Sequence, residues 1–282
     1  MNLRTFYKIY YEHRFQKSSI ILKIYIIILI PFNFLINKLF LQPVKNLDDS
    51  KKKKPELFIK DLNFLFQYFN SDKGEKYINQ YQKPIKQNRE LIQGHSYHSF
   101  YEKFFFDKKN DKINLLEIGS FKGNATAAFF FYFPYSSIIS GDIFPDLFRY
   151  RSERIKSFYL DNSKISELEN KILNYDYKFD IIIEDAGHYF KDQIISLFVL
   201  FKSLKSNGVF VVEELEFPNV REDMNPKKEK PSLKDILELI NNKNDFSSEY
   251  VTKSQKEYFL ENFKSIEIFK GTTSEIAFIT KK

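Results

Sequence analysis

Apolar and polar residues alternate in a regular way along the second half of the chain. Near-continuous apolar runs are typical of strands buried on both faces of a parallel sheet, and the segments between them have the length of helices. The predicted strands are INLLEIG (113–119), SIISGDIF (137–144), SFYL (157–160), FDIIIEDAGH (179–188) and GVFVVEEL (208–215). The predicted helices that follow them cover residues 124–132, 145–155, 163–174 and 189–205.

Two further apolar runs stand near the end of the chain. SIEIFK (265–270) and SEIAFIT (274–280) are joined by the short turn Gly271–Thr273 and follow a predicted helix over residues 231–242. They predict a C-terminal antiparallel hairpin. Together with the preceding strand–helix units they indicate an α/β fold, a Rossmann-like, doubly wound, mostly parallel seven-stranded sheet. We expect residues 113–282 to form this domain.

Residues 55–112 have a different pattern. ELFIKDLNFLFQYF (56–69) has apolar residues at helical spacing and leads into SDKG, where Gly74 is expected to cap the helix in the left-handed conformation. HSYHSFYEKFF (95–105) predicts a short amphipathic helix. We therefore expect residues 55–112 to form a helical cap on the sheet domain.

Residues 1–54 contain a long apolar stretch. Residues 20–41 reach the length of about 20 residues that a bilayer requires, but they include two lysines, two asparagines and Pro31. With Lys51–Lys54 beyond it, such a segment suits the anionic surface of a cytoplasmic membrane, and surface attachment is favoured over a true span. The alternative is a helix packed on the globular body, with Lys51–Lys54 as a solvated linker. Because no small-residue cleavage site follows, we expect a cytoplasmic protein with an N-terminal helical extension over residues 1–54.

The distribution of charge along the chain decides whether a polyanion partner is expected. The 282 residues carry a net charge of +7, which taken whole suggests a polyanion partner. However, residues 1–60 hold 12 Lys and Arg against 4 Asp and Glu, whereas residues 61–282 hold 32 against 33. The basic character belongs to the N-terminus, so no nucleic-acid partner is expected. The absence of Cys excludes disulfides and thiolate sites, and the histidines are His13, His95, His98 and His188.

Nearly every predicted strand ends in an acid. In open α/β sheets, ligands bind at the carboxyl ends of the strands, where Glu117, Asp142, Asp161, Asp185, Glu213 and Glu214 stand. The first turn, EIGSFKG, lacks the G-x-G-x-x-G spacing of a dinucleotide site. Its glycines, Gly119 and Gly123, with Asp142 for the ribose hydroxyls and Asp161 near the adenine, suit S-adenosylmethionine (SAM). The alternative for the two glycines is a plain tight turn.

The D-A-G-H segment carries the most specific chemistry. Asp185 and an acid from the adjacent strand end, Glu213 or Glu214, suit a hard cation such as Mg²⁺. His188 then stands where it can remove a proton from a metal-bound hydroxyl, whose pKa the metal lowers. The alternative is structural, with Asp185 capping the next helix and His188 in its first turn.

The order of these motifs resembles that of SAM-dependent O-methyltransferases of the mycinamicin type, which methylate sugar hydroxyls with a divalent metal. The resemblance covers roughly residues 60–280. It rests on S-D-K-G (71–74), H-x-Y-x-x-x-Y-E (95–102), L-L-E-I-G-x-x-x-G (115–123), F-P-x-x-x-I-x-x-G-D-I (133–143), D-I-I-I-x-D-x-x-H (180–188) and the acidic pair within 211–215.

The resemblance implies a role for each matching residue. Asp185 and Glu214, with Glu213 beside them, would hold Mg²⁺, and His188 would be the general base. The SAM-binding residues would be Glu117, Gly119, Ser120, Gly123, Asp142, Ile143, Asp161 and Asp185. The S-D-K-G and H-x-Y segments would close over the site.

The implied activity is Mg²⁺-assisted O-methylation of a sugar or glycoside acceptor. One departure bears on it, because the family has Glu-Asp where this chain has Glu213-Glu214. Three alternatives stay open: a non-catalytic, membrane-associated protein with a degenerate methyltransferase fold, a non-sugar acceptor, and a nucleic-acid methyltransferase. The sequence also leaves open a homo-oligomer.

Overall fold

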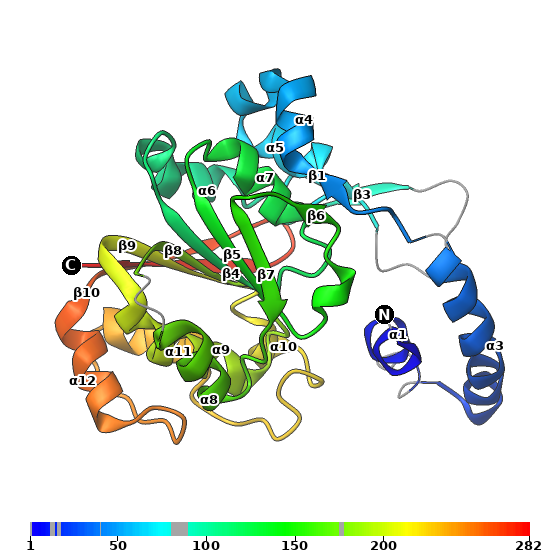
Figure 1. Cartoon of the computed structure of the whole chain (residues 1–282). Helices are drawn as coiled ribbons and strands as arrows, with labels where there is room; N and C mark the ends of the chain where they lie inside the picture. The colour runs from blue at the N-terminus through cyan, green and yellow to red at the C-terminus, as the bar shows by residue number, and fades with distance from the viewer. Residues whose placement is uncertain (1, 12–14, 16–17, 40, 80–89, 175–177) are drawn as a thin grey trace.

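The seven-stranded sheet predicted from the sequence is present in the computed structural model, which describes residues 2–11, 15, 18–39, 41–79, 90–174 and 178–282. The strand order is β10-β11-β9-β8-β4-β5-β7 (Figure 1). The parallel strands are β4 (Asn114–Ile118), β5 (Ser137–Asp142), β7 (Ile155–Tyr159), β8 (Phe179–Glu184) and β9 (Leu204–Glu213). The strands β10 (Phe263–Lys270) and β11 (Glu275–Lys281) are antiparallel, with β11 next to β9.

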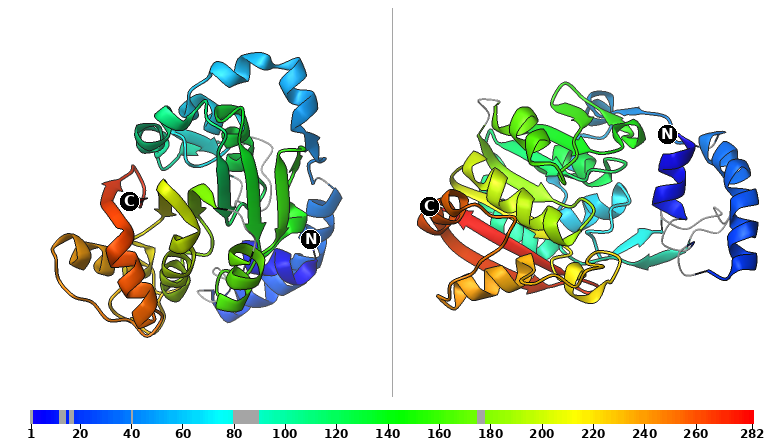
Figure 2. Two further views of the ribbon diagram at one scale, coloured as in Figure 1. Left: turned by 60° about the vertical axis from the view of Figure 1, so that its left-hand side comes forward. Right: turned by 90° about the horizontal axis from the view of Figure 1, so that it is seen from below.

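Helices cover both faces of this sheet, as Figures 1 and 2 show. Successive residues of a strand point to opposite faces, so Leu115 packs with one layer and Leu116 with the other. The first layer contains α5 (Leu62–Tyr68), α6 (His98–Phe105) and α7 (Asn124–Tyr132). The second contains α8 (Ile165–Leu168), α9 (Phe190–Leu200), α11 (Leu233–Asn241) and α12 (Lys253–Asn262).

Most predicted helices are confirmed, with shifted ends. α7 has the predicted bounds, α11 falls within residues 231–242, and α8 continues into a π-helical turn, Glu169–Leu173. α9 ends in a 3₁₀ turn, Phe201–Ser203, because β9 already begins at Leu204. The sequence pattern missed α12 and the short α10 (Phe217–Val220).

The predicted helix over residues 145–155 is wrong. Only a 3₁₀ turn forms, Pro145–Leu147, and the chain then extends through β6 (Tyr150–Arg151). β6 pairs in parallel with β1 (Lys45–Asn46), and Tyr150 is buried in the first helical layer. Pairing with a distant segment therefore overrides the local preference.

The prediction for residues 56–69 also needs correction. The segment divides into a 3₁₀ turn, Pro55–Ile59, and α5. Asp61 caps α5 by accepting a hydrogen bond from the Phe64 N–H at 2.7 Å. Asn70, and not Gly74, has the left-handed backbone after α5, with φ of +60°. Beyond it, β2 (Lys76–Ile78) and β3 (Leu91–Gln93) form an antiparallel hairpin.

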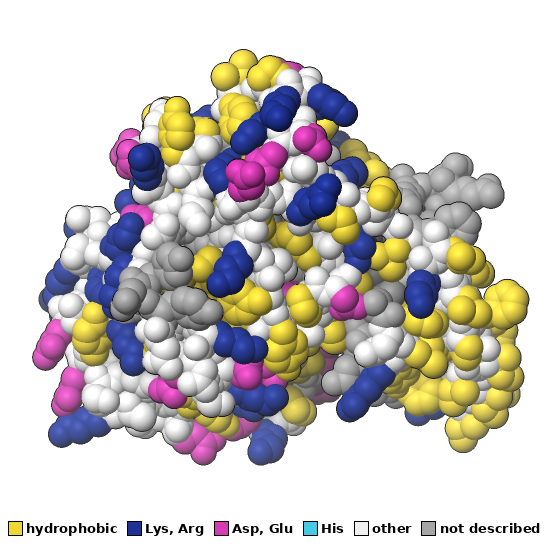
Figure 3. Space-filling view, viewed as in Figure 1, with side chains coloured by type: hydrophobic (Ala, Val, Ile, Leu, Met, Phe, Trp, Pro, Cys, Tyr) yellow, Lys and Arg dark blue, Asp and Glu magenta, His cyan; other side chains and the backbone are white. Residues whose placement is uncertain are grey.

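The N-terminal helices stand beside the body (Figure 1). α1 (Leu3–Tyr10) packs on α3 (Ile20–Leu39) through a small cluster of Phe6, Tyr11, Ile26 and Ile30. Among the described residues, α3 is the one helix whose length and composition suit a membrane span, and little of it is buried. Its exposed apolar side chains include Ile21, Ile28 and Phe32, and Figure 3 shows apolar surface over this region.

In the described part of the chain, β1 pairs with β6 of the body, and α4 (Leu47–Lys53) follows directly after it. Leu47 is buried in the main core, and Lys54 donates a hydrogen bond to the Tyr68 hydroxyl at 2.6 Å. Lys51–Lys54 are therefore part of the fold and not a free linker, and α3 packs on α1 instead of forming a core helix of the body.

Candidate active site

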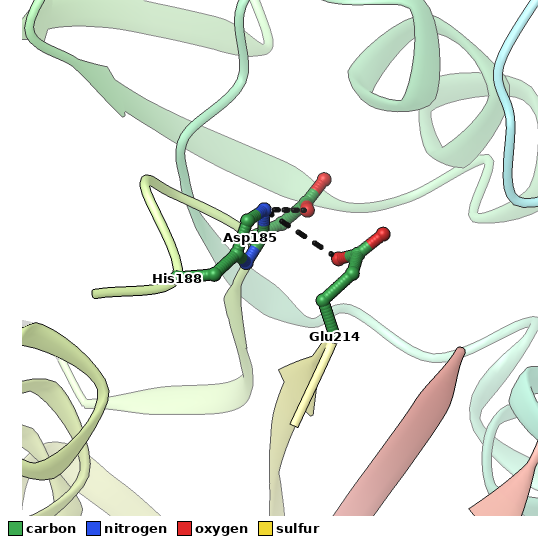
Figure 4. Close-up of side chains that lie close together, drawn as sticks. All are labelled: Asp185, His188 and Glu214. Atoms are coloured by element: carbon green, nitrogen blue, oxygen red, sulfur yellow. Dashed lines mark ion pairs between the residues drawn. The ribbon is translucent and has the colours of Figure 1, made fainter. Parts of the chain in front are cut away.

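Three of the predicted site residues meet at the carboxyl edge of the sheet. Asp185 follows β8, Glu214 follows the neighbouring β9, and His188 lies in the loop after Asp185. One ligand atom from each lies within 4.8 Å of the others, and Figure 4 shows the side chains pointing toward one another. The His188 Nε2 atom is 3.8 Å from Asp185 Oδ1 and 3.6 Å from Glu214 Oε2.

The backbone at two of these residues is unusual. His188 has φ of +54° and Glu214 has φ of +46°, in the left-handed region that side chains with a Cβ rarely adopt. Such conformations cost of order 1 kcal/mol each and gather at functional sites. α9 starts only at Phe190 and lacks a side-chain cap, so the capping interpretation of Asp185 does not hold.

A lysine that the sequence analysis did not single out completes the site. Lys73, in the S-D-K-G segment, is buried, and its Nζ lies 2.5 Å from Asp185 Oδ2 and 2.7 Å from Glu213 Oε2. Burial acts to lower the pKa of Lys73, but the two carboxylates raise it well above its ordinary value. Lys73 is therefore a permanent cation inside the site. The S-D-K-G motif that contains it was the sequence feature that could have pointed to this role.

The two adjacent glutamates point to different partners. Glu213 is fully buried and also accepts a hydrogen bond from the Tyr101 hydroxyl on α6. Glu214 instead forms an ion pair with His95, whose Nε2 lies 2.8 Å from Oε1. His95 is held in turn by Thr273 and Ser274, in the turn between β10 and β11. The S-D-K-G and H-x-Y segments thus both reach the strand ends.

The two histidines have opposite electrostatic surroundings. Burial acts to lower the pKa of His95, but Glu214 outweighs it and raises this pKa to about 9. Burial, assisted by the charges of Lys73, His95 and Arg221, lowers the pKa of His188 in spite of Glu214. Burial acts to raise the pKa of Glu214, yet His188 and His95 hold it well below its ordinary value. At neutral pH His95 is charged and His188 is free to accept a proton.

His98 lies apart from this chemistry. The His98 Nε2 atom is 4.0 Å from Glu75 and does not enter the three-residue group. His13 lies outside the described residues.

The donor set fits a divalent cation. Two carboxylates and a nearby imidazole are ligands that hard and borderline cations accept. Among the described residues, Glu214 Oε2 and His188 Nδ1 are buried without a hydrogen-bond partner, which is costly unless something else satisfies them. Glu213, bound to Lys73 and Tyr101, is not a member of the group.

The two glycines of the first turn are required by packing. Gly119 has φ of +88°, and a Cβ there would overlap the carbonyl oxygen of Asp185. Gly123 has φ of +79°, and a Cβ would overlap the Phe148 ring. The close approach at Gly119 brings the predicted SAM-binding turn directly against the Asp185 loop.

Asp142 joins two turns at the predicted SAM site. Its carboxylate accepts hydrogen bonds from the Phe121 and Phe144 N–H groups, each at 2.7 Å. A carboxylate offers about four acceptor positions, so capacity remains for two ribose hydroxyls. The buried Ser120 Oγ has no hydrogen-bond partner among the described residues, and Ile143 beside Asp142 is 44% exposed. These features fit a polar ligand at this turn.

Two other predicted SAM ligands have local partners. Glu117 is buried, accepts a hydrogen bond from the Thr126 hydroxyl, and has a pKa raised by burial. Asp161 binds Ser163 and pairs with Lys164 at 3.0 Å. Asp161 follows β7 at the far edge of the sheet, so the structure does not bring it into the Asp185 group.

Comparison with known proteins establishes the fold. No family model and no curated protein matches the chain. Among solved structures, the MycE methyltransferase from the mycinamycin biosynthetic pathway, in complex with Mg and SAH, matches 79% of this chain and 55% of its own, with 19% identity and a TM-score of 0.57. The same enzyme with Mg, SAH and mycinamycin VI matches 79% and 54%, with 19% identity and a TM-score of 0.58. This chain therefore shares the fold of the matched part of that enzyme.

The extent of this likeness is limited. The chain spans about half the length of MycE. At 19% identity the agreement concerns the arrangement of the strands and helices.

Proposed function

We propose that this protein is a SAM-dependent O-methyltransferase that uses a divalent metal, Mg²⁺, and acts on a hydroxyl of a sugar or glycoside. The observation that carries the proposal is the group of Asp185, His188 and Glu214 at the carboxyl edge of a methyltransferase fold. The presence of Mg and SAH in MycE supports both cofactors, and its complex with mycinamycin VI supports a glycoside acceptor.

The proposed chemistry divides among these residues. Asp185 and Glu214 would hold the metal, which lowers the pKa of a bound hydroxyl. His188, whose pKa is lowered, accepts the proton that the acceptor hydroxyl loses during methyl transfer. Glu214 lies 3.6 Å from His188 Nε2 and stabilises the imidazolium that forms.

The cofactor would lie along the turns that meet at Asp142. In this proposal the hydroxyls of the ribose bind Asp142, and Gly119, Ser120, Gly123 and Ile143 shape the turn, with Glu117, Asp161 and Asp185 at the neighbouring strand ends. Holding both reactants at one edge supplies the proximity on which methyl transfer depends.

The primary test is calorimetric titration of the full-length protein with SAM, with and without Mg²⁺. Binding that leads to methylation of members of a glycoside panel is expected. Failure to bind SAM at millimolar concentration would leave the non-catalytic alternative, a degenerate methyltransferase fold.

The catalytic assignment has its own variants. His188→Ala should lower turnover by about 10²–10⁴-fold, the usual contribution of a general base, while SAM affinity changes little. Asp185→Asn should also abolish most turnover. His98→Ala is the matched control, since His98 lies outside the group. Full activity in His188→Ala contradicts the assignment of the base.

We also propose that the N-terminal helices attach the protein to the cytoplasmic surface of a membrane. The support is the exposed apolar surface of α3, together with the basic residues that flank it in sequence. The β2–β3 hairpin projects from the body on the same side as α1 and α3 (Figures 1 and 2).

A further inference from the structure

Glu213 and Glu214 are neighbours of the same residue type at the end of the same strand, yet they lie in different environments. Glu214 faces His95 and His188 and belongs to the group that fits a metal. Glu213 is bound on one oxygen by Lys73 and on the other by Tyr101. The two carboxylates are therefore not interchangeable ligands.

Lys73 binds two of the three carboxylates of the site, those of Asp185 and Glu213. Its Nζ binds Oδ2 of Asp185 at 2.5 Å and Oε2 of Glu213 at 2.7 Å, whereas Oδ1 of Asp185 faces His188. The Lys73 side chain is only 1% exposed, and the Tyr101 that closes the other side of Glu213 is fully buried. A buried ammonium persists only when such partners compensate its desolvation.

We propose that Lys73 is a positioning residue that withholds Glu213 from the metal. The proposal rests on the metal site of the proposed function. The cation is then held by Asp185 and Glu214 alone among the site's three neighbouring carboxylates, with Lys73 as a fixed positive charge nearby. Fewer carboxylate ligands leave the metal more weakly bound and more effective at polarising a hydroxyl.

The same substitution, Glu to Gln, made separately at Glu213 and at Glu214 tests which of the two binds the metal. Mn²⁺ serves as the probe, and its dissociation constant is measured on full-length protein by calorimetry and by electron paramagnetic resonance. Glu213→Gln is expected to change the constant by less than about threefold, and Glu214→Gln to weaken binding by at least about tenfold, since even indirect supports of a metal contribute about 10–100-fold.

Removal of the lysine tests its role directly. In Lys73→Met the site loses a positive charge and Glu213 is released, so Mn²⁺ should bind at least about tenfold more tightly, with SAM affinity unchanged. Lys281→Met is the matched control. Lys281 is also buried, but its Nζ binds the Leu204 carbonyl at 2.8 Å and the Tyr258 hydroxyl at 2.7 Å, away from the site. A merely structural role for Lys73 predicts the same unchanged affinity in both lysine variants.

The outcomes separate this inference from the proposed function. Absence of Mn²⁺ binding by the wild-type protein overturns the proposed metal site and the role of Lys73 with it. Normal wild-type binding that Glu213→Gln weakens as much as Glu214→Gln overturns the role of Lys73 and leaves the metal site standing. If Lys73→Met does not fold, the pair of glutamine variants decides alone.

Discussion

Two apolar helices of this chain have opposite surroundings. In α7, every residue from Ala125 to Tyr132 is buried, because the helix lies between the sheet and α5. In α3, most apolar side chains are exposed in the described part of the chain, where Ile26 and Ile30 pack against α1 and the adjoining Tyr11. An apolar sequence therefore indicates that a helix has apolar surface to bury, and only the surrounding structure shows what packs against it.

The same contrast separates the two regions to which these helices belong. The body brings its acids, His95, His188 and Lys73 together at one sheet edge, whereas the N-terminal helices contribute apolar surface and most of the net charge. We expect the body to account for folding and chemistry, and the N-terminal helices for location. Two predictions test this division, and two more test contacts within the body.

The largest effect is expected from deletion of residues 1–44, a cut made just before β1. The shortened protein should fold and bind SAM like the full chain, but lose its attachment to vesicles of anionic lipid. One acyl chain gives a binding constant of only about 10⁴ M⁻¹, and the exposed face of α3 should exceed it. Sedimentation with vesicles measures the loss. If the full-length protein stays in the supernatant, the proposed membrane attachment is wrong.

A pair of substitutions compares the two helices directly. Phe129→Ala in α7 should destabilise the protein by about 3–5 kcal/mol, because it opens a cavity in a packed core. Ile28 in α3 is 69% exposed. Ile28→Ala should therefore change the free energy of unfolding by less than about 0.5 kcal/mol, as surface substitutions usually do. Urea unfolding in detergent-free buffer measures both. Equal losses would show that α3 is buried in solution.

The ion pair of His95 and Glu214 should make stability depend on pH. The pKa of His95 rises from 6.5 to about 9 on folding. The contribution of the pair to the free energy of unfolding is therefore complete below pH 6.5 and is lost as pH rises through 9. The difference in unfolding free energy between wild type and His95→Gln, measured with a chelator present, should therefore fall by about 1–3 kcal/mol across this interval. His98→Gln is the control. A difference that stays constant with pH argues against the pair.

The smallest effect is expected at a helix cap. Ser232 accepts a hydrogen bond from the Asp235 N–H at 3.2 Å, and Asp235 accepts one from the Ser232 N–H at 2.9 Å. Both donors are thus satisfied in a capping box. Ser232→Ala should lower the free energy of unfolding by about 1 kcal/mol. Ser254→Ala, at an exposed position in the first turn of α12, should change it less. Thermal unfolding ranks the two variants.

The sequence by itself determined the sheet and the edge where ligands would bind. Apolar runs such as those of β4 and β8 are long enough to require burial on both faces, and the bounds of α7 follow from its apolar run and the preceding Gly123. The positions of Asp185 and Glu214 after adjacent parallel strands follow from the same pattern, because parallel strands end at one edge.

Only the tertiary structure decided which acids work together. Lys73 and Asp185 are 112 positions apart, and no periodicity predicts that a lysine from the segment after α5 enters the site. The separation of Glu213 from Glu214 depends on Tyr101, which binds Glu213, and on His95, which pairs with Glu214. The extended chain at β6 depends on pairing with β1. Local sequence specifies which surfaces must be buried, whereas contacts between distant segments select the partner for each charged group.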